Sequence, residues 1–154
     1  MIARALAAFE GWHEQVRTII AAAETCFIWA LFDRDPLQHW SVGRTTLLGD
    51  ACHPMYPFMG QGAAMAVEDG AALAACLLAV DDPAEALQHY EQLRLPRVTR
   101  LQEMSRANNT RFHMRDGPAQ QARDAEWARA ADRSPDALRW LYEFDAGAVE
   151  AAAA

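Results

Sequence analysis

The residues best suited to chemistry lie between Asp50 and the helix start that follows it. Asp50 precedes a proline-containing loop that ends in Gly60 and Gly62. These glycines lack a Cβ, so a flat or bulky ligand can approach the main chain closely there. The backbone amides of Gly62, Ala63 and Ala64 would be unpaired at a helix start, with the positive end of the helix dipole behind them. Such a position favours an anion or an electron-rich carbonyl group.

A strand, a loop and a helix must position these residues. Thr45 to Leu48 is a β-branched and apolar run bounded by glycines, which predicts a buried strand. Asp50 then falls at the carboxyl end of that strand, where ligands bind in open α/β sheets. Prolines stiffen the loop from Pro54 to Met59, and the alanine-rich run from Ala63 to about Leu78 predicts a helix. The same pattern also fits an acidic turn, a proline loop and a core helix that bind no ligand.

The whole string over residues 43–74, GRTTLLGDACHPMYPFMGQGAAMAVEDGAALA, resembles the second flavin-binding motif of FAD-dependent aromatic-ring monooxygenases. These enzymes are related to salicylate and hydroxybenzoate hydroxylases. The family pattern is a strand, GDAAH, a proline loop, GQG and a helix containing ED. This chain departs from it at Cys52, which replaces the second alanine. The resemblance implies an α/β fold class: a carboxyl-terminal fragment of an FAD-binding monooxygenase fold, mostly helical with two or three strands.

The resemblance also implies roles for the site residues. Asp50 would bond a ribityl hydroxyl of FAD, and Pro57 would lie against the isoalloxazine ring. Gly60 belongs to the GQG element. The amides of Gly62, Ala63 and Ala64 would lie near the pyrimidine edge of the flavin, where negative charge develops on reduction. The complete enzyme would use FAD, NADPH or NADH as reductant, and O₂ to hydroxylate a small aromatic substrate.

The flanking sequence predicts mostly helices. Apolar residues at helical spacing predict a helix from Ile2 to Ala23, locally weakened by Gly11, and the run Cys26 to Phe32 predicts a buried strand. Asp82 is expected to cap a long helix that begins near Pro83 and extends to about Met114. Pro96 is expected to kink this helix. Two short helices are predicted over 120–131 and 135–144, and residues 151–154 are expected to fray.

The arginines of the long helix are expected to form a solvated face with acidic partners. In the resembled family, residues 1–40 correspond to the end of the substrate-domain segment and its return strand. Residues 41–154 correspond to the carboxyl-terminal part of the FAD-binding domain with a helical tail. None of the glycines forms the GxGxxG fingerprint that holds the FAD pyrophosphate. The resemblance therefore covers only the carboxyl-terminal part of the family, and we expect the chain to be inactive alone.

Composition narrows the class of protein. The formal net charge is −7, and this acidic balance argues against nucleic acid as a partner. All the basic residues are arginines. The widely spaced Cys26, Cys52 and Cys76 indicate neither a disulfide framework nor a zinc site. No uncharged apolar stretch is long enough to span a bilayer, and the amino-terminal run does not resemble a signal peptide. These features predict a cytoplasmic protein with no membrane partner.

Other arrangements compete with the flavin interpretation. Cys52 and His53 could form a nucleophile and base, but adjacent side chains on an extended turn point apart, so Cys52 is expected to fill apolar space. Glu68 and Asp69 are expected to cap, to pair with arginines or to be solvated, rather than to act as an acid–base pair, because neighbours in a helix face different directions. Tyr56 and His53 either pack the loop or face the substrate side of the flavin. No catalytic residue is identified, and histidine spacing indicates no metal site.

Two classes of function remain open at this stage. The chain is either part of a flavin monooxygenase, cut from a whole enzyme or completed by another chain, or a non-catalytic helical remnant that binds a partner. In both cases an uncovered apolar face would favour self-association or binding of a complementing chain.

Overall fold

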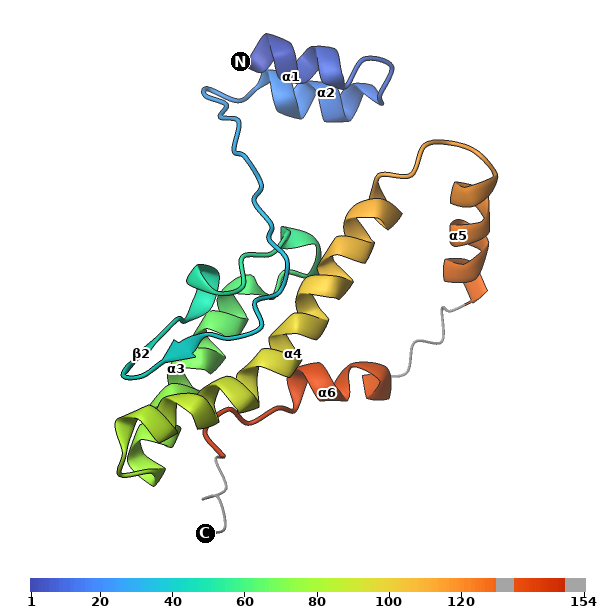
Figure 1. Cartoon of the computed structure of the whole chain (residues 1–154). Coiled ribbons are helices and arrows are strands. Elements are labelled where there is room, and N and C mark those ends of the chain that lie inside the picture. The colour runs from blue at the N-terminus through green and yellow to red at the C-terminus, as the bar shows by residue number, and fades with distance from the viewer. Residues whose placement is uncertain (130–134, 149–154) are drawn as a thin grey trace. The chain divides into compact units, whose positions relative to one another are not determined.

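A computed structural model describes residues 1–129 and 135–148 of the chain (Figure 1). The chain divides into two compact units, Met1–Leu31 and Phe32–Ala154. The described elements are helical apart from one two-stranded sheet. This agrees with the predicted fold class, although the individual elements differ in several places.

The first unit is a pair of short helices, α1 (Ile2–Ala8) and α2 (Glu14–Ala21). The prediction of one continuous helix over this region is wrong. The chain turns at Gly11, whose φ of +80° is a left-handed conformation that interrupts a right-handed helix. Arg17 holds the turn by donating hydrogen bonds to the carbonyls of Leu6 and Phe9, at 3.1 and 2.9 Å.

The run Cys26 to Phe32 is not the predicted buried strand. It carries no regular secondary structure, and the side chains of Phe27 and Trp29 are 74% and 82% exposed. A strand needs a neighbouring strand to pair its backbone groups. Within the described residues this run has no such neighbour, so its apolar composition does not produce a strand.

The second unit contains a β-hairpin in place of a single buried strand. β1 (Ser41–Val42) pairs antiparallel with β2 (Thr45–Thr46), and Ser41 lies opposite Thr46. The prediction of a buried strand over Thr45 to Leu48 was therefore wrong in length and burial, since Leu47 and Leu48 are 36% and 39% exposed. The carboxylate of Glu91 accepts hydrogen bonds from the amides of Trp40 and Ser41, which fixes the hairpin to the long helix α4 (Pro83–Phe112).

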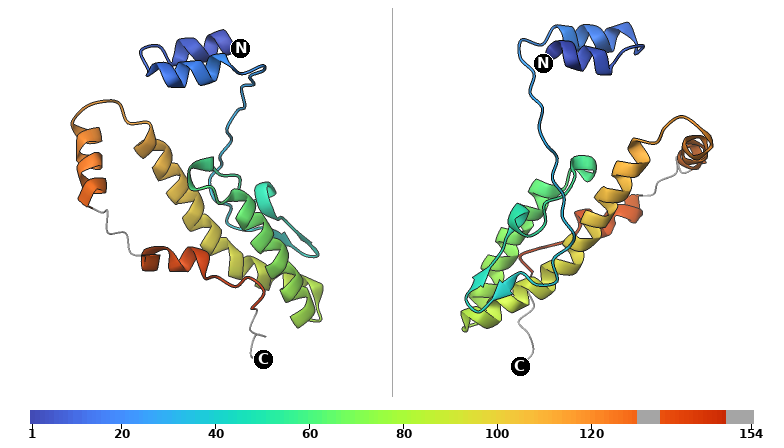
Figure 2. Two further views of the ribbon diagram at one scale, coloured as in Figure 1. Left: turned by 180° about the vertical axis from the view of Figure 1, so that it is seen from behind. Right: turned by 45° about the horizontal axis from the view of Figure 1, so that its top comes forward.

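Two long helices, α3 (Gly62–Ala79) and α4 (Pro83–Phe112), pack side by side and form the core of this unit (Figures 1 and 2). The predicted start of α4 is confirmed: the Asp82 side chain accepts hydrogen bonds from the amides of Ala84 and Glu85, and Pro83 is the first helical residue. The helix continues through Pro96. The core between the helices contains Met65, Ala72, Cys76, Ala86, Tyr90, Val98 and Leu101, with Trp40 from the hairpin.

The remaining elements are short. The turn and loop before α3 contain two 3₁₀ helices, η1 (Gly49–Ala51) and η2 (Pro57–Met59). After α4 come α5 (Pro118–Arg129), η3 (Pro135–Leu138) and α6 (Arg139–Tyr142). The predicted helices over 120–131 and 135–144 thus correspond to described helices, while residues 130–131 and the predicted fraying end at 151–154 lie outside the described part.

α3 is long and apolar enough to cross a membrane by length and composition alone. Its fully buried side chains include a carboxylate, Asp69, which bonds to groups outside the helix. A buried, hydrogen-bonded polar group of this kind is typical of a core helix. The apolar composition of α3 is therefore weak evidence for a membrane span.

Candidate flavin site

Asp50 lies on a tight turn formed by η1. Gly49 begins the turn with a φ of +60°, and its carbonyl accepts hydrogen bonds from the amides of Cys52 and His53, both at 3.0 Å. A Cβ at position 49 would lie 3.2 Å from the Cβ of Ala66, so a side chain there would be strained in conformation and would require Ala66 to shift slightly. Asp50 itself is exposed and makes no hydrogen bond or ion pair with any residue that the structure describes. Its carboxylate is therefore available to a ligand.

The proline loop that follows is fixed to α4 through its backbone. Pro57 is exposed at the start of η2, and Gly60 ends this 3₁₀ helix. Gln102 donates a hydrogen bond to the Pro54 carbonyl at 3.2 Å, and Asn108 donates one to the Phe58 carbonyl at 3.3 Å. The Ser105 hydroxyl donates to the Tyr56 carbonyl between them. We call Gln102, Ser105 and Asn108 the loop anchor.

The start of α3 matches the predicted anion-binding end of a helix. α3 begins one residue earlier than expected, at Gly62, and the side chain of Gln61 makes no capping hydrogen bond. The first helical amide with an intrahelical partner is that of Met65, which donates to the Gln61 carbonyl at 2.9 Å. The amides of Gly62, Ala63 and Ala64 precede it and have no partner among the described residues. The predicted cluster of unpaired donors is thus present.

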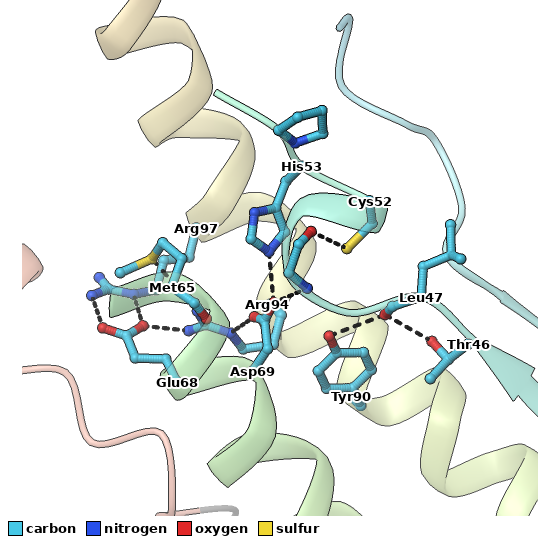
Figure 3. A network of polar contacts seen from close by, with 12 residues as sticks. Thr46, Leu47, Cys52, His53, Met65, Glu68, Asp69, Tyr90, Arg94 and Arg97 are labelled. Atoms are coloured by element: carbon cyan, nitrogen blue, oxygen red, sulfur yellow. Dashed lines mark hydrogen bonds and ion pairs between the residues drawn. The ribbon is translucent and has the colours of Figure 1, made fainter. Parts of the chain in front are cut away.

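The turn and the helix are joined by one buried carboxylate. The Oδ2 atom of Asp69, on α3, accepts a hydrogen bond from the Gly49 amide at 3.0 Å and lies 2.6 Å from Nε2 of His53 (Figure 3). Its Oδ1 accepts a hydrogen bond from Nε of Arg94 at 2.8 Å. Burial would raise the pKa of Asp69, but the hydrogen bonds from His53, Arg94 and Gly49 outweigh it and hold the pKa below its ordinary value.

Of the three alternatives to an acid–base pair, the structure shows arginine pairing for both Glu68 and Asp69. Glu68 pairs with Arg94 at 2.7 Å and with Arg97 at 2.8 Å. Burial opposes ionisation of Glu68, yet the hydrogen bonds from Arg97 and Arg94 hold its pKa below the ordinary value. These two carboxylates are therefore anchored as anions and are not poised for proton transfer.

The prediction that the arginines of α4 form a solvated face is wrong for two of them. The side chain of Arg94 is fully buried, and that of Arg97 is only 8% exposed. Arg97 also donates hydrogen bonds to the carbonyls of Trp140 and Leu141, which ties α6 to α4. The prediction is confirmed for Arg106, which pairs with Asp33 and Asp35, and for Arg111, which pairs with Glu126. The burial of Arg94 and Arg97 was not predicted because a hydropathy scale gives every arginine the same value.

Cys52 is a buried packing residue, as expected. Burial raises the pKa of its thiol to about 12, with the neighbouring Asp69 carboxylate adding to the shift. The thiol donates to the Gly49 carbonyl at 3.3 Å, while the His53 ring contacts Asp69. A protonated thiol whose neighbouring imidazole is engaged elsewhere is not an activated nucleophile.

Cys52, His53 and Asp69 also place possible metal-ligating atoms within 4.8 Å of one another. Asp69 already accepts hydrogen bonds from Gly49 and Arg94, and metal binding would require an ionised thiol. The hydrogen bonds of these three side chains therefore account for their proximity without a metal ion. His53 is fully buried, which supports the packing interpretation of this residue, and the Tyr56 ring packs against Phe58 with centroids 5.7 Å apart.

Sequence reasoning missed the residues that support the site. Gly49 and Arg94 gave no separate signal, because their roles depend on contacts between distant parts of the chain. The loop anchor did have a signal: residues 102, 105 and 108 are polar and spaced by three, so they share one face of a helix that is otherwise packed.

Comparison with known proteins identifies the family of the chain. Residues 16–105 match the family described as FAD binding domain. The chain is 49% identical over 146 residues to 3-amino-4-hydroxybenzoate 2-monooxygenase PtmB3 of Streptomyces platensis, covering 94% of this chain and 36% of that protein. It is 50% identical over 103 residues to 6-hydroxynicotinate 3-monooxygenase of Pseudomonas fluorescens, covering 66% of this chain and 27% of that protein.

Solved structures show the same relationship. A salicylate hydroxylase substrate complex superposes with a TM-score of 0.76 at 31% identity, over 96% of this chain and 36% of that one. HpxO of Klebsiella pneumoniae, complexed with FAD and uric acid, gives a TM-score of 0.74 at 30% identity, over 91% and 36%. The chain spans about a third of the length of these relatives. With more than half of its residues matched, the chain belongs to the FAD binding domain family of flavin-dependent aromatic monooxygenases.

Proposed function

We propose that the chain is the carboxyl-terminal part of a flavin-dependent monooxygenase that hydroxylates a small aromatic compound with NAD(P)H and O₂. The observation that carries the proposal is the exposed, unpaired Asp50 carboxylate on a rigid turn that is bonded to α3. The unpaired amides at the start of the same helix add a second set of groups for the flavin end of FAD.

The residues present fit the flavin end of the cofactor. Asp50 offers acceptor oxygens for ribityl hydroxyls, and the amides of Gly62, Ala63 and Ala64 offer donors for the electron-rich edge of the ring. Gly60 leaves space for close approach, and the exposed Pro57 offers an apolar surface to the ring face. When bound and reduced, the flavin supplies the oxygen-activating chemistry, whereas these residues bind and orient it.

The relatives indicate the substrate class. Those named above act on hydroxylated or aminated rings such as 3-amino-4-hydroxybenzoate and 6-hydroxynicotinate. We infer that the complete protein acts on a small electron-rich aromatic substrate. We also infer that it acts in the cytoplasm. We assign residues 1–40 to the end of the substrate-domain segment and residues 41–154 to the FAD-binding domain with its helical tail.

The chain alone presents few contacts to a dinucleotide. Asp50, one loop and one helix start can meet only the flavin end, and no GxGxxG sequence is present for the pyrophosphate. We therefore propose that activity requires the rest of the fold. The test uses a chimera that joins this chain to the part of PtmB3 that it does not match, which we call the reconstituted enzyme.

The test is to measure FAD binding by flavin fluorescence and NAD(P)H oxidation in the reconstituted enzyme. Asp50→Ala is compared with Asp81→Ala, because Asp81 is another exposed aspartate with no partner among the described residues. Stoichiometric flavin in the parent, loss of affinity in Asp50→Ala and no loss in Asp81→Ala support the proposal. A reconstituted parent that folds but binds no FAD contradicts it.

A second candidate is a non-catalytic domain that binds a partner. It is favoured by the exposed apolar side chains of Phe27, Trp29 and Leu78, the last of which is 90% exposed. Such surfaces often mark interaction sites. Tight self-association of the chain, with no flavin binding in any reconstituted form, would favour this candidate.

A further inference from the structure

Both ends of the Asp50 turn are held by the same buried side chain. The Gly49 amide precedes Asp50 and the His53 ring follows it, and each contacts Oδ2 of Asp69 (Figure 3). Asp69 and His53 are fully buried. Asp50, by contrast, makes no contact of its own that would orient it among the described residues. The direction of its carboxylate therefore depends on the conformation of the turn.

Asp69 is itself fixed from the opposite side. Nε of Arg94 donates to Oδ1 at 2.8 Å, so the carboxylate cannot rotate without losing a buried ion pair. Arg94 is held in turn by Glu68 at 2.7 Å. A fixed counter-charge on one oxygen thus leaves the other oxygen directed at the turn.

We propose that Asp69 is a positioning residue for the flavin site, which sets the orientation of Asp50 by holding Gly49 and His53. This inference rests on the proposed flavin-binding function of Asp50. It assigns to the acidic pair of α3 a role that differs between its members: Asp69 controls the turn, while Glu68 only supports the arginines.

The neighbouring Glu68 supplies a matched control. It shares Arg94 with Asp69 and also binds Arg97, but it has no hydrogen bond to Gly49 or His53. Asp69→Ala and Glu68→Ala each remove one carboxylate from the same arginine. Only the first removes the acceptor that holds the turn.

The first measurement is amide hydrogen exchange in the flavin-free chain, followed in peptides that contain residues 49–53. We expect Asp69→Ala to speed exchange of this turn by about tenfold or more, because the Gly49 amide loses its buried acceptor and the His53 ring loses its partner. Glu68→Ala should leave the turn within about twofold of the parent while changing exchange near α6. Equal effects of the two variants on the turn, or no effect of either, overturn the proposal.

A folding defect in Asp69→Ala would not remove the test. His53→Phe keeps a ring in place but cannot bond Asp69, and it too should speed exchange of the turn. If Asp69→Ala loses its far-ultraviolet circular dichroism, His53→Phe decides, and unchanged exchange in that variant overturns the proposal.

The second measurement is FAD affinity in the reconstituted enzyme. Asp69→Ala should raise the dissociation constant by about tenfold, whereas Glu68→Ala should leave it within about twofold. Faster exchange of the turn with unchanged FAD affinity overturns the link to the flavin. A parent that binds no FAD overturns the proposed function instead, and the flavin-free exchange data still show whether Asp69 holds the turn.

Discussion

The imidazole of His53 and the carboxylate of Asp69 lie 2.6 Å apart, and both side chains are completely buried. They come from different elements, since His53 follows the η1 turn and Asp69 lies inside α3. Their contact links the turn that carries the exposed Asp50 to the helix whose start offers unpaired amides. The two halves of the proposed flavin site therefore share one rigid connection.

The first prediction concerns Asp50. Asp50→Ala in the reconstituted enzyme should weaken FAD binding by about 1–3 kcal/mol, the range for a lost hydrogen bond to a charged group. Since Asp50 has no partner in the described chain, thermal stability without flavin should not change. Fluorescence titration and melting curves measure the two effects. Normal FAD affinity in the variant would remove Asp50 from the site.

The second prediction concerns Gly62. A Cβ at this position would lie 3.8 Å from Cγ of Met55, so the fold has room for alanine. In the reconstituted enzyme, Gly62→Ala should therefore fold normally, whereas Gly62→Val should reduce flavin content by crowding the helix start. The flavin-to-protein absorbance ratio of both purified variants provides the comparison. Parent-like flavin content and reduction rate in Gly62→Val would mean that Gly62 serves only the turn.

The third prediction concerns the chain without its complement. Ordering a ligand-binding loop costs about 1–2 kcal/mol for each backbone residue fixed, which a few hydrogen bonds of about 1 kcal/mol each hardly offset. We expect weak or no FAD binding and no NAD(P)H oxidation by the isolated chain. Saturable micromolar binding with NADH turnover would show that these residues suffice.

The fourth prediction is a loss of stability in acid. The pKa values of Glu68 and Asp69 lie below their ordinary values of 4.5 and 3.8. The stability that these carboxylates contribute is therefore complete above about pH 4.5, and it is lost as the pH falls through their lower folded-state pKa values. Urea unfolding midpoints measured from pH 7 to pH 3 should fall, and Glu68→Gln should flatten the fall. An unchanged slope in that variant would contradict the assignment.

The fifth prediction concerns the attachment of α6. Arg97 bonds Glu68 and two carbonyls of the α6 region, and its guanidinium lies 4.2 Å from the centre of the Phe144 ring. Arg97→Ala should lower the free energy of unfolding by about 1.5–3 kcal/mol, because it removes charged hydrogen bonds to Glu68 and two carbonyls, although Arg94 still pairs with Glu68. The control is Arg139→Ala. Arg139 is exposed and pairs with Asp136 and Glu143, so this variant should lower the free energy of unfolding by less than about 1 kcal/mol. Urea unfolding gives both values, and equal costs would argue against the attachment.

The sequence was informative where structure depends on local chemistry. Asp82 and Pro83 begin α4 as predicted, since a cap needs only the adjacent residues. The loop and the helix start were found because their signals are local: proline restricts the backbone, glycine permits turns, and alanine favours a helix. The run Cys26 to Phe32 was misassigned because a strand depends on a neighbour elsewhere in the fold. The burial of Arg94 was missed for a similar reason, since its partner Asp69 lies on another helix.

The loop anchor fixes the backbone of the proline loop without contacting the loop side chains through these hydrogen bonds. Gln102, Ser105 and Asn108 hold the loop through the carbonyls of Pro54, Tyr56 and Phe58, and every amino acid has a carbonyl. Substitutions along the loop can therefore alter what it presents to a bound ring while these attachments persist. Substitutions that change which aromatic ring is preferred should therefore occur in the loop, whereas Gln102, Ser105 and Asn108 of α4 should tolerate little change.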